Sequence, residues 1–262
     1  MAVVGFIGTG NMGSALARAA AKSEKTQRLL LANRSPEKAE RLAAELSGEV
    51  LDNRRVAQEA QVLFLAVKPQ YLPGMYEGIR DVLESRKDRF VLVSMVAGWS
   101  LERLRTELGP WPCVRIMPNI PVAAGGGVTL LCADAAVSEE EKALVRDLLA
   151  ASGLVAELEE NLLDAASGVT GCGPAFAAMF VEALADGAVA CGLPRALALA
   201  YAAGMLKGTA ELLLASGEHP AVLKDRVCSP GGSTIQGVRA LEESGFRAAV
   251  MNAVIAAYEK EF

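Results

Sequence analysis

The chain has 262 residues, which suits one large or two medium domains, and 52% of them are hydrophobic, which is ample for buried cores. Its net charge is −5 and it has no Lys/Arg block, so nucleic acid is not an expected partner. Five scattered cysteines, an odd number without a C-x-x-C pair, indicate free thiols in a reducing compartment and argue against a disulfide framework or a zinc site.

The two long uncharged stretches of the chain are each interrupted by Gly and Pro. They cover residues 116–133 and 165–181, and neither is expected to span a membrane. The chain begins with an apolar run that is predicted to be its first strand, which leaves no room for a signal peptide. We therefore expect a soluble, cytoplasmic protein with no membrane partner.

A glycine-rich turn follows the first apolar run, residues 2–7. Residues 8–13 read Gly-Thr-Gly-Asn-Met-Gly, which is G-x-G-x-x-G between an expected strand and an expected helix. The first Gly permits the tight turn, the second lets a pyrophosphate approach the backbone, and the third lets helix pack on strand. The helix N-terminus adds free N–H groups and a positive dipole end. The motif predicts a dinucleotide site, and the alternative is a turn without a ligand. The expected contacts here are Ile7, Gly8, Thr9, Gly10, Asn11 and Met12.

The end of the second apolar run, residues 28–32, bears on which dinucleotide binds. An NAD enzyme usually has Asp or Glu here to hold the ribose 2′-OH. This chain has Asn33, Arg34 and Ser35, with no acid before Glu37. Because a guanidinium forms planar, charge-assisted bonds with phosphate, we predict NADP(H), with NAD(H) as a weaker substitute. The alternative is that Ser35 is only a helix N-cap. A cap at Ser35 is compatible with a phosphate site, because the cap does not use Asn33 or Arg34.

Further apolar runs alternate with helices through the first part of the chain. Ser100 is expected to cap one helix, and Ser138 with Glu141 forms a capping-box pattern before another. This alternation predicts a mostly parallel, doubly wound sheet of the Rossmann type, covered on both faces, over residues 1–158. The expected strands after the second are residues 62–67, 90–96, 112–117, 127–132 and 154–157.

Ligands bind beyond the carboxyl ends of the strands in such sheets, so segments at that edge are candidate cofactor contacts. Lys68 precedes a proline and is expected to be extended; the alternative is an ordinary surface lysine. Asn119 offers an amide in a turn between two prolines, and a plain turn is an equal alternative. The expected contacts at this edge are Asn53, Ala66, Val67, Lys68, Pro69, Val96, Ala97 and Asn119.

The pattern changes near residue 160, where strand signals end and Ala/Leu-rich helices begin. Helices are expected at 174–190, 194–216, from 233 and at 245–260. They are apolar around much of their circumference, so residues 159–262 are predicted to be an all-α domain that buries surface in a dimer. The alternative is a very apolar monomeric bundle.

A second glycine-rich loop opens one of these helices and is a candidate site for a small anion such as a carboxylate. The equal alternative is an interhelix turn with Ser233 and Gln236 as a capping box. His219 is expected at the surface, and the chain shows no metal-ligand cluster. So few proton-transfer groups suit a substrate that carries its own proton, such as a protonated imine. The loop's candidate residues are Ser229, Gly231, Gly232, Ser233 and Thr234.

The chain resembles pyrroline-5-carboxylate reductases nearly end to end, and two of its motifs are far more specific than a Rossmann turn. The matching segments are residues 6–12, 66–70, 115–119, 171–176 and 229–235. The resemblance implies NADPH-dependent reduction of 1-pyrroline-5-carboxylate to L-proline, with residues 229–234 holding the substrate carboxylate and Thr234 as the catalytic residue that bonds the ring nitrogen. It also implies a helical domain that dimerises, with dimers often forming decamers.

Three residues depart from that family's pattern: Cys172, Phe176 and Ile120 each lack a hydroxyl that the family usually has. They leave room for a shifted pocket, so reduction of another cyclic imine carboxylate is the first alternative. A non-catalytic, nucleotide-sensing dimer is the second. A 3-hydroxyacid dehydrogenase is less well supported, because the chain has no lysine early in its helical part.

Overall fold

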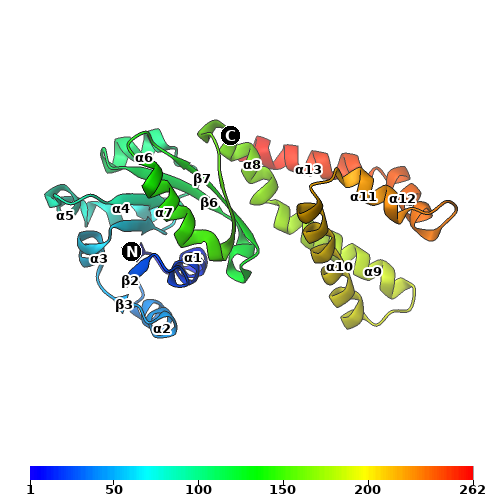
Figure 1. Cartoon of the computed structure of the whole chain (residues 1–262), viewed down its shortest axis with the longest axis horizontal. Helices are drawn as coiled ribbons and strands as arrows, with labels where there is room; N and C mark the ends of the chain where they lie inside the picture. Colours follow the sequence, from blue (N-terminus) through cyan, green and yellow to red (C-terminus); the bar gives the residue numbers. More distant parts are fainter. Residues whose placement is uncertain (262) are drawn as a thin grey trace. The chain divides into compact units, whose positions relative to one another are not determined.

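The computed structural model describes residues 1–261 and separates the chain into two compact units, Met1–Gly171 and Cys172–Lys260 (Figure 1). The first unit holds every strand found in these residues, and the second is helical. This is the α/β class with a helical C-terminal part that the sequence predicts. The domain boundary expected after residue 158 remains a prediction; by contacts, the units divide after Gly171.

The first unit is built on one eight-stranded sheet of order β3-β2-β1-β4-β5-β6-β7-β8. Neighbouring strands are parallel except β6 and β7, which are antiparallel, so the expected mostly parallel sheet is confirmed. Strand β3 was not predicted, because it has only two residues, both exposed. The strands are β1 (Ala2–Ile7), β2 (Thr26–Ala32), β3 (Glu49–Val50), β4 (Val62–Leu65), β5 (Val91–Ser94), β6 (Cys113–Pro118), β7 (Gly127–Ala133) and β8 (Gly153–Glu157).

Helices of this unit begin where the sequence supplies caps. The Ser100 side chain accepts a hydrogen bond from the Arg103 amide, and Ser138 and Glu141 form the expected capping box. Ser35 occupies the N-cap position before Pro36 without a side-chain bond. The helices are α1 (Asn11–Ala21), α2 (Pro36–Leu46), α3 (Asn53–Glu59), η1 (Pro69–Tyr71), α4 (Leu72–Glu77), α5 (Arg80–Ser85), α6 (Leu101–Leu108), η2 (Ile120–Ala124), α7 (Glu139–Leu149), η3 (Ala150–Ser152) and α8 (Glu160–Thr170).

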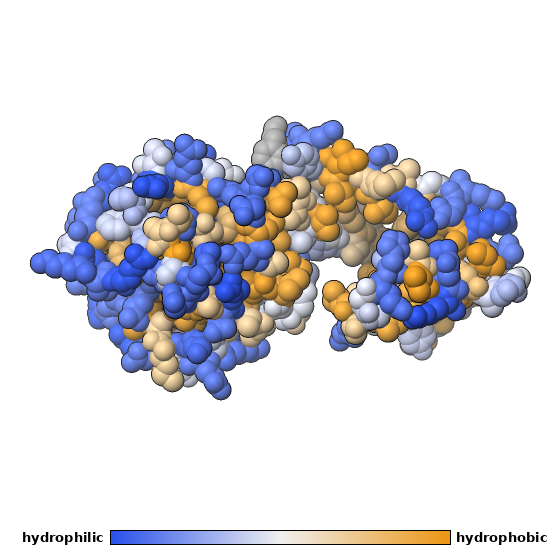
Figure 2. All heavy atoms as spheres, turned by 45° about the horizontal axis from the view of Figure 1, so that its top comes forward, coloured by the Kyte–Doolittle hydropathy of each residue, from blue (hydrophilic) through white to orange (hydrophobic). Residues whose placement is uncertain are grey.

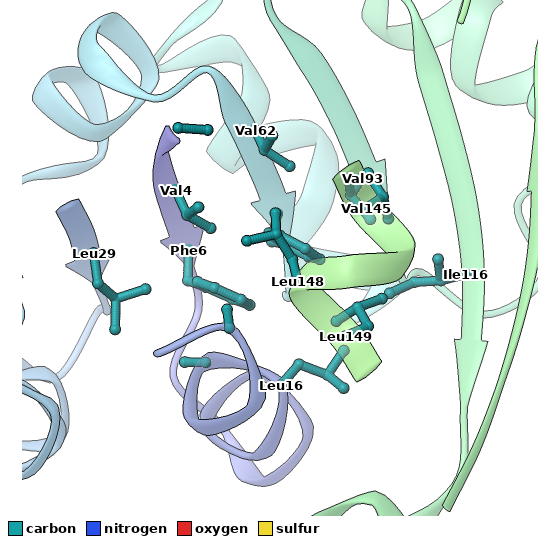
Figure 3. Close-up of a cluster of buried hydrophobic side chains, with 14 of the residues drawn as sticks. Val4, Phe6, Leu16, Leu29, Val62, Val93, Ile116, Val145, Leu148 and Leu149 are labelled. Carbon is teal, nitrogen blue, oxygen red and sulfur yellow. The ribbon is translucent and has the colours of Figure 1, made fainter. Parts of the chain in front are cut away.

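Both faces of the sheet are buried, which explains why its strands are continuous apolar runs. On one face, side chains of β1, β4, β5 and β6 pack against α1 and α7 (Figure 3). Phe6 and Phe64 stack there at 4.3 Å between ring centroids. On the other face, Leu63 and Leu65 pack with Leu83 and Leu104 of α5 and α6. The two cores hold the central strands β1 and β4 rigidly, and the loops at their carboxyl ends with them.

Helix α8 packs against the outer strands of the sheet. Leu163 is fully buried beside Leu130 and Cys132 of β7. Arg115 of β6 reaches across to α8, where it pairs with Glu160 at 2.9 Å and Asp164 at 3.5 Å. These contacts explain why α8 belongs with the sheet by contacts, although its sequence has the composition of the helical part.

The second unit consists of helices α9 (Gly173–Ala190), α10 (Arg195–Ser216), α11 (Pro220–Val227), α12 (Ser233–Glu243) and α13 (Phe246–Glu261). Helix α11 was not predicted; His219 caps it by accepting a hydrogen bond from the Ala221 amide, and its ring is exposed as expected. The capping box expected at Ser233 and Gln236 is wrong. Gly232 holds the N-cap position, so Ser233 already lies inside the helix and cannot cap it.

Few residues of the helical unit are buried within one chain. Between Cys172 and Lys260 only Ala185, Ala198 and Ala202 are buried, and large apolar side chains are exposed over its surface, orange in Figure 2. By length and composition alone, the described stretches Glu160–Ala190 and Arg195–Ser216 are apolar enough to cross a membrane. The same composition also suits helices that pack against a second protein chain. Exposed side chains include Met179, Leu197, Tyr201, Leu212, Leu214, Val227, Met251 and Ile255.

Candidate functional site

A cavity of about 900 Å³ lies at the carboxyl ends of β1, β2 and β4. In the strand order, β1 is the point from which the chain winds in both directions, and this is where doubly wound sheets bind their ligands. Ten of the predicted cofactor contacts line the cavity: Ile7, Gly8, Gly10, Asn33, Arg34, Ser35, Asn53, Ala66, Val67 and Lys68. The structure therefore brings these ten residues together around one cavity of the first unit.

The three glycines of the first turn differ in what requires them. Gly8 has φ of +107°, and a Cβ there would overlap the Ala66 carbonyl. A Cβ at Gly13 would overlap the Gly8 carbonyl, so both glycines are needed for packing. Gly10 has φ of −71° and no atom within 4 Å of where its Cβ would lie. The protein's own packing does not require this glycine, whereas a ligand that approaches the backbone closely would.

Asn33 fixes the loop that follows β2. Its Oδ1 accepts a hydrogen bond from the Thr9 amide at 3.0 Å, and its Nδ2 donates to the Ser35 carbonyl at 3.0 Å. The side chain thus ties the glycine turn to the loop that carries Arg34. Asn33 contributes to the site by holding these two loops, a role that the sequence pattern did not reveal because it depends on contacts between strands.

Positive charge dominates the polar lining of the cavity. Arg34, Lys38, Arg54 and Lys68 line it, against one carboxylate, Asp52. Arg54 is held by Asp81 at 2.8 Å, but among the side chains described, residues 1–260, no carboxylate lies within ion-pair distance of the other three cations. Uncompensated cations beside an open glycine turn fit a ligand with several phosphate groups.

Several residues that line this cavity lie outside the contacts predicted from the sequence, Lys38 and Tyr71 among them. Lys38 lies in the first turn of α2 and Tyr71 at the end of η1. Lys38 follows the Asn33–Ser35 segment closely, so a search of the whole first turn of α2 would have included it. Lys68 is extended before Pro69, as its sequence predicts.

Other predicted cofactor contacts do not line the cavity. Thr9 is buried, with an unpartnered hydroxyl, and Met12 packs against the core. Val96 is 2% exposed and belongs to the second core. These assignments stay predictions, as they do for Asn11, Pro69 and Ala97.

Asn119 joins three segments of the first unit. Its Oδ1 accepts a hydrogen bond from the Val128 amide at 2.8 Å, and its Nδ2 donates to the Thr170 carbonyl at 2.9 Å. The amide thereby ties the end of β6 to β7 and to the end of α8. A structural role in a turn was the alternative to cofactor binding that the sequence left open. Both the oxygen and the nitrogen of the Asn119 side chain already have hydrogen-bond partners within the protein.

The second glycine-rich loop leads into α12. Gly231 has φ of +69°, and the Gly232 amide donates to the Ser229 carbonyl at 3.0 Å. A Cβ at Gly232 would overlap the Ser229 hydroxyl, so a larger residue there would have to displace that side chain. Among residues 1–260, no hydrogen-bond partner is found for the hydroxyls of Ser233 and Thr234. The first turn of α12 thus presents two hydroxyls and free amides, which is a suitable arrangement for a carboxylate.

Two family models match the chain. Residues 160–261 match the pyrroline-5-carboxylate reductase dimerisation family, and residues 3–98 match the family described as NADP oxidoreductase, coenzyme F420-dependent. The two matches correspond to the helical part and to the glycine-turn end of the sheet.

Whole-chain comparisons agree with these matches. The chain is 44% identical to the pyrroline-5-carboxylate reductase of Synechocystis sp. over 80% of this chain and 77% of that protein. It is 38% identical to that of Pisum sativum over 98% of this chain and 94% of the relative. It belongs to the pyrroline-5-carboxylate reductase family. The crystal structure of pyrroline carboxylate reductase from Plasmodium falciparum with NADP bound has a TM-score of 0.85 at 31% identity, covering 99% of this chain and 97% of that one.

Membership of this family explains why the helices of the second unit expose so many apolar side chains. The matched helical segment is a dimerisation family, so the apolar surface of α9 to α13 has the character of a subunit interface. The chain is an oxidoreductase of this family, and a cavity lined with cations lies at the carboxyl edge of its sheet.

Proposed function

We propose that this chain reduces 1-pyrroline-5-carboxylate to L-proline, with NADPH as hydride donor. The observation that carries the proposal is 38% identity over 98% of the chain with a reductase of that name, together with a cation-lined cavity at the switch point of the sheet. When bound, NADPH supplies the hydride that is added to the imine carbon. The chain's own residues bind the cofactor and the substrate and orient them for hydride transfer.

Cofactor selection is assigned to the loop after β2. Arg34, with Asn33 and Ser35 beside it, binds the ribose 2′-phosphate, because no acid stands there to bind a 2′-OH. Lys38 adds a second cation to the lining of the cavity. NADH lacks the 2′-phosphate, so it is the weaker substitute.

Substrate binding is assigned to the loop before α12. The first-turn amides and the Ser233 hydroxyl hold the substrate carboxylate, with Ser229, Gly231 and Gly232 shaping the loop. Thr234 is the proposed catalytic residue, whose hydroxyl bonds the ring nitrogen. A protonated imine needs no further proton once hydride has added to carbon, so hydrogen bonding and orientation are sufficient.

The assembly that follows is a homodimer in which a second copy covers the apolar helix faces, with a decamer built from five such dimers as the larger form. We place the protein in the cytoplasm, with no nucleic acid or membrane as partner. Helices that are long and apolar enough to cross a membrane are, on this proposal, interface helices.

The test is the rate of NADPH oxidation by the purified protein with 1-pyrroline-5-carboxylate, beside the six-membered cyclic imine carboxylate and beside NADH. Fast turnover of the five-membered ring with NADPH is the expected result. Turnover of the six-membered ring alone would establish the alternative substrate and implicate Cys172, Phe176 and Ile120. Inactivity on both rings would favour the nucleotide-sensing dimer.

A further inference from the structure

Arg34 has an aromatic partner at the wall of the cavity. Its guanidinium carbon lies 4.9 Å from the centroid of the Tyr71 ring. Arg54, the other arginine of the lining, is instead gripped by both carboxylate oxygens of Asp81. In the described part of the chain, the Arg34 guanidinium has no ion pair or hydrogen bond to another side chain, and the Tyr71 ring is the partner found for it.

The backbones on both sides of this contact are fixed. Arg34 lies in the loop after β2, which Asn33 fastens to the glycine turn. Tyr71 ends η1, and its amide donates to the Lys68 carbonyl at 2.9 Å, directly beyond β4. Because β2 and β4 flank β1, the contact brings together loops from both sides of the glycine turn.

A cation–π contact leaves N–H groups of an arginine side chain available for hydrogen bonds. An aromatic face attracts a guanidinium within about 6 Å of its centroid. The ring holds the cation without supplying an oxygen acceptor, so N–H groups of the guanidinium remain available to phosphate oxygens, which bind them in the guanidinium plane. A carboxylate partner would have occupied those N–H groups, as Asp81 does for Arg54.

We propose that Tyr71 is a positioning residue for cofactor selection: its ring holds the Arg34 guanidinium at the cavity without using an oxygen acceptor, so that N–H groups stay available to the 2′-phosphate of NADPH. This inference rests on the proposed cofactor. Tyr71 acts through Arg34, so its contribution requires both the 2′-phosphate and the guanidinium. The hydroxyl of Tyr71 has no part in it.

The experiment measures dissociation constants of 2′,5′-ADP and 5′-AMP for the wild type, Tyr71→Leu and Tyr71→Phe. A cation–π contact at an exposed position contributes about 0.5–1 kcal/mol, which is about a two- to fivefold change in Kd. Tyr71→Leu should weaken 2′,5′-ADP by that factor and leave 5′-AMP unchanged. Tyr71→Phe, which keeps the ring face, should bind both probes as the wild type does.

Two results would overturn the inference. Equal weakening of both probes would mean that the ring contacts adenosine rather than acting through Arg34, and unchanged 2′,5′-ADP binding would mean that the contact contributes nothing. In an Arg34→Ala background, Tyr71→Leu should have no further effect. Failure of the proposed function is separate: it would appear as absent turnover of 1-pyrroline-5-carboxylate by the wild type, whatever the pattern of probe binding.

Discussion

At the scale of single residues, some groups of the site are needed for the fold itself, whereas others are not required by packing or internal hydrogen bonding. Gly8, Gly13 and Asn119 are fully explained by packing and hydrogen bonds inside the protein. Gly10 and Arg34 are not, since one has open space above its Cα and the other has no carboxylate partner among the described residues. Residues that the fold does not need in this form are the stronger candidates for ligand contacts.

The first residue-scale prediction concerns the choice of cofactor. Arg34→Ala should raise the KM for NADPH about tenfold or more and change that for NADH little, because a charge-assisted bond to phosphate contributes about 1.5–3 kcal/mol. Arg105→Ala is the matched control, since it removes one positive charge from α6, whose residues do not line the cavity. Equal losses for the two cofactors would exclude Arg34 from the 2′-phosphate site.

The second concerns the loop before α12. Thr234→Ala should lower kcat about tenfold or more while the Kd for NADPH stays the same, because only the bond to the substrate is lost. Turnover and cofactor titration measure the two effects. Unchanged kcat would remove Thr234 from the mechanism. Gly232→Val is a poor test, since a side chain there displaces Ser229 and disturbs the loop itself.

The third concerns two buried thiols. Burial raises the pKa of the Cys132 thiol to about 12, with Glu160 adding to the effect, and raises that of Cys113 well above its ordinary value. Both folded pKa values exceed the unfolded value of about 8.5, so the stabilisation is complete below that pH and is lost as pH rises further.

The free energy of unfolding should therefore fall above about pH 9, by about 1.4 kcal/mol per pH unit for each thiol. Urea titrations of the wild type and of the Cys113→Ala, Cys132→Ala double variant at several pH values measure it. The double variant should show a shallower decline. Parallel curves for the two proteins would contradict the assignment.

At the scale of elements, the sequence predicted most of the sheet because strands buried on both faces are continuous apolar runs. It missed β3, which buries nothing, and α11, which is short and bears three charges in eight residues. It also missed Tyr71 as a neighbour of Arg34. That contact joins residues far apart in the sequence, and a pattern along the chain does not show such contacts.

The attachment of α8 to the sheet gives an element-scale prediction. Arg115 is 5% exposed and pairs with Glu160, whose Oε1 also accepts from the Leu101 amide at 2.7 Å. Arg115→Met leaves this partly exposed carboxylate without its cation. The free energy of unfolding should fall by about 2–3 kcal/mol, less than the 3–5 kcal/mol of a fully buried pair.

Arg18→Met is the matched control for this change, because the pair of Arg18 with Glu45 is exposed on both sides. Its expected cost is about 0–1 kcal/mol. Urea denaturation of both variants gives the comparison. Equal losses would mean that the Arg115 cluster does not anchor α8 to the sheet.

At the scale of the whole molecule, the helical unit cannot cover its own apolar surface, and the dimerisation family that it matches explains why. Substitution of exposed apolar residues such as Leu212 and Leu214 by Glu should shift the protein toward monomers, because charge is costly in an apolar interface. Light scattering after size exclusion measures the mass. A wild type that is monomeric at micromolar concentration would contradict the proposed dimer.

Hydride transfer to the imine carbon is tested most directly with NADPH that carries deuterium at the transferable position. The purified protein is incubated with this cofactor and 1-pyrroline-5-carboxylate, and the product is examined by mass spectrometry and NMR. We expect L-proline with one deuterium on the ring carbon that neighbours nitrogen and bears no carboxylate. Proline without deuterium, or no proline at all, would contradict the proposed reaction.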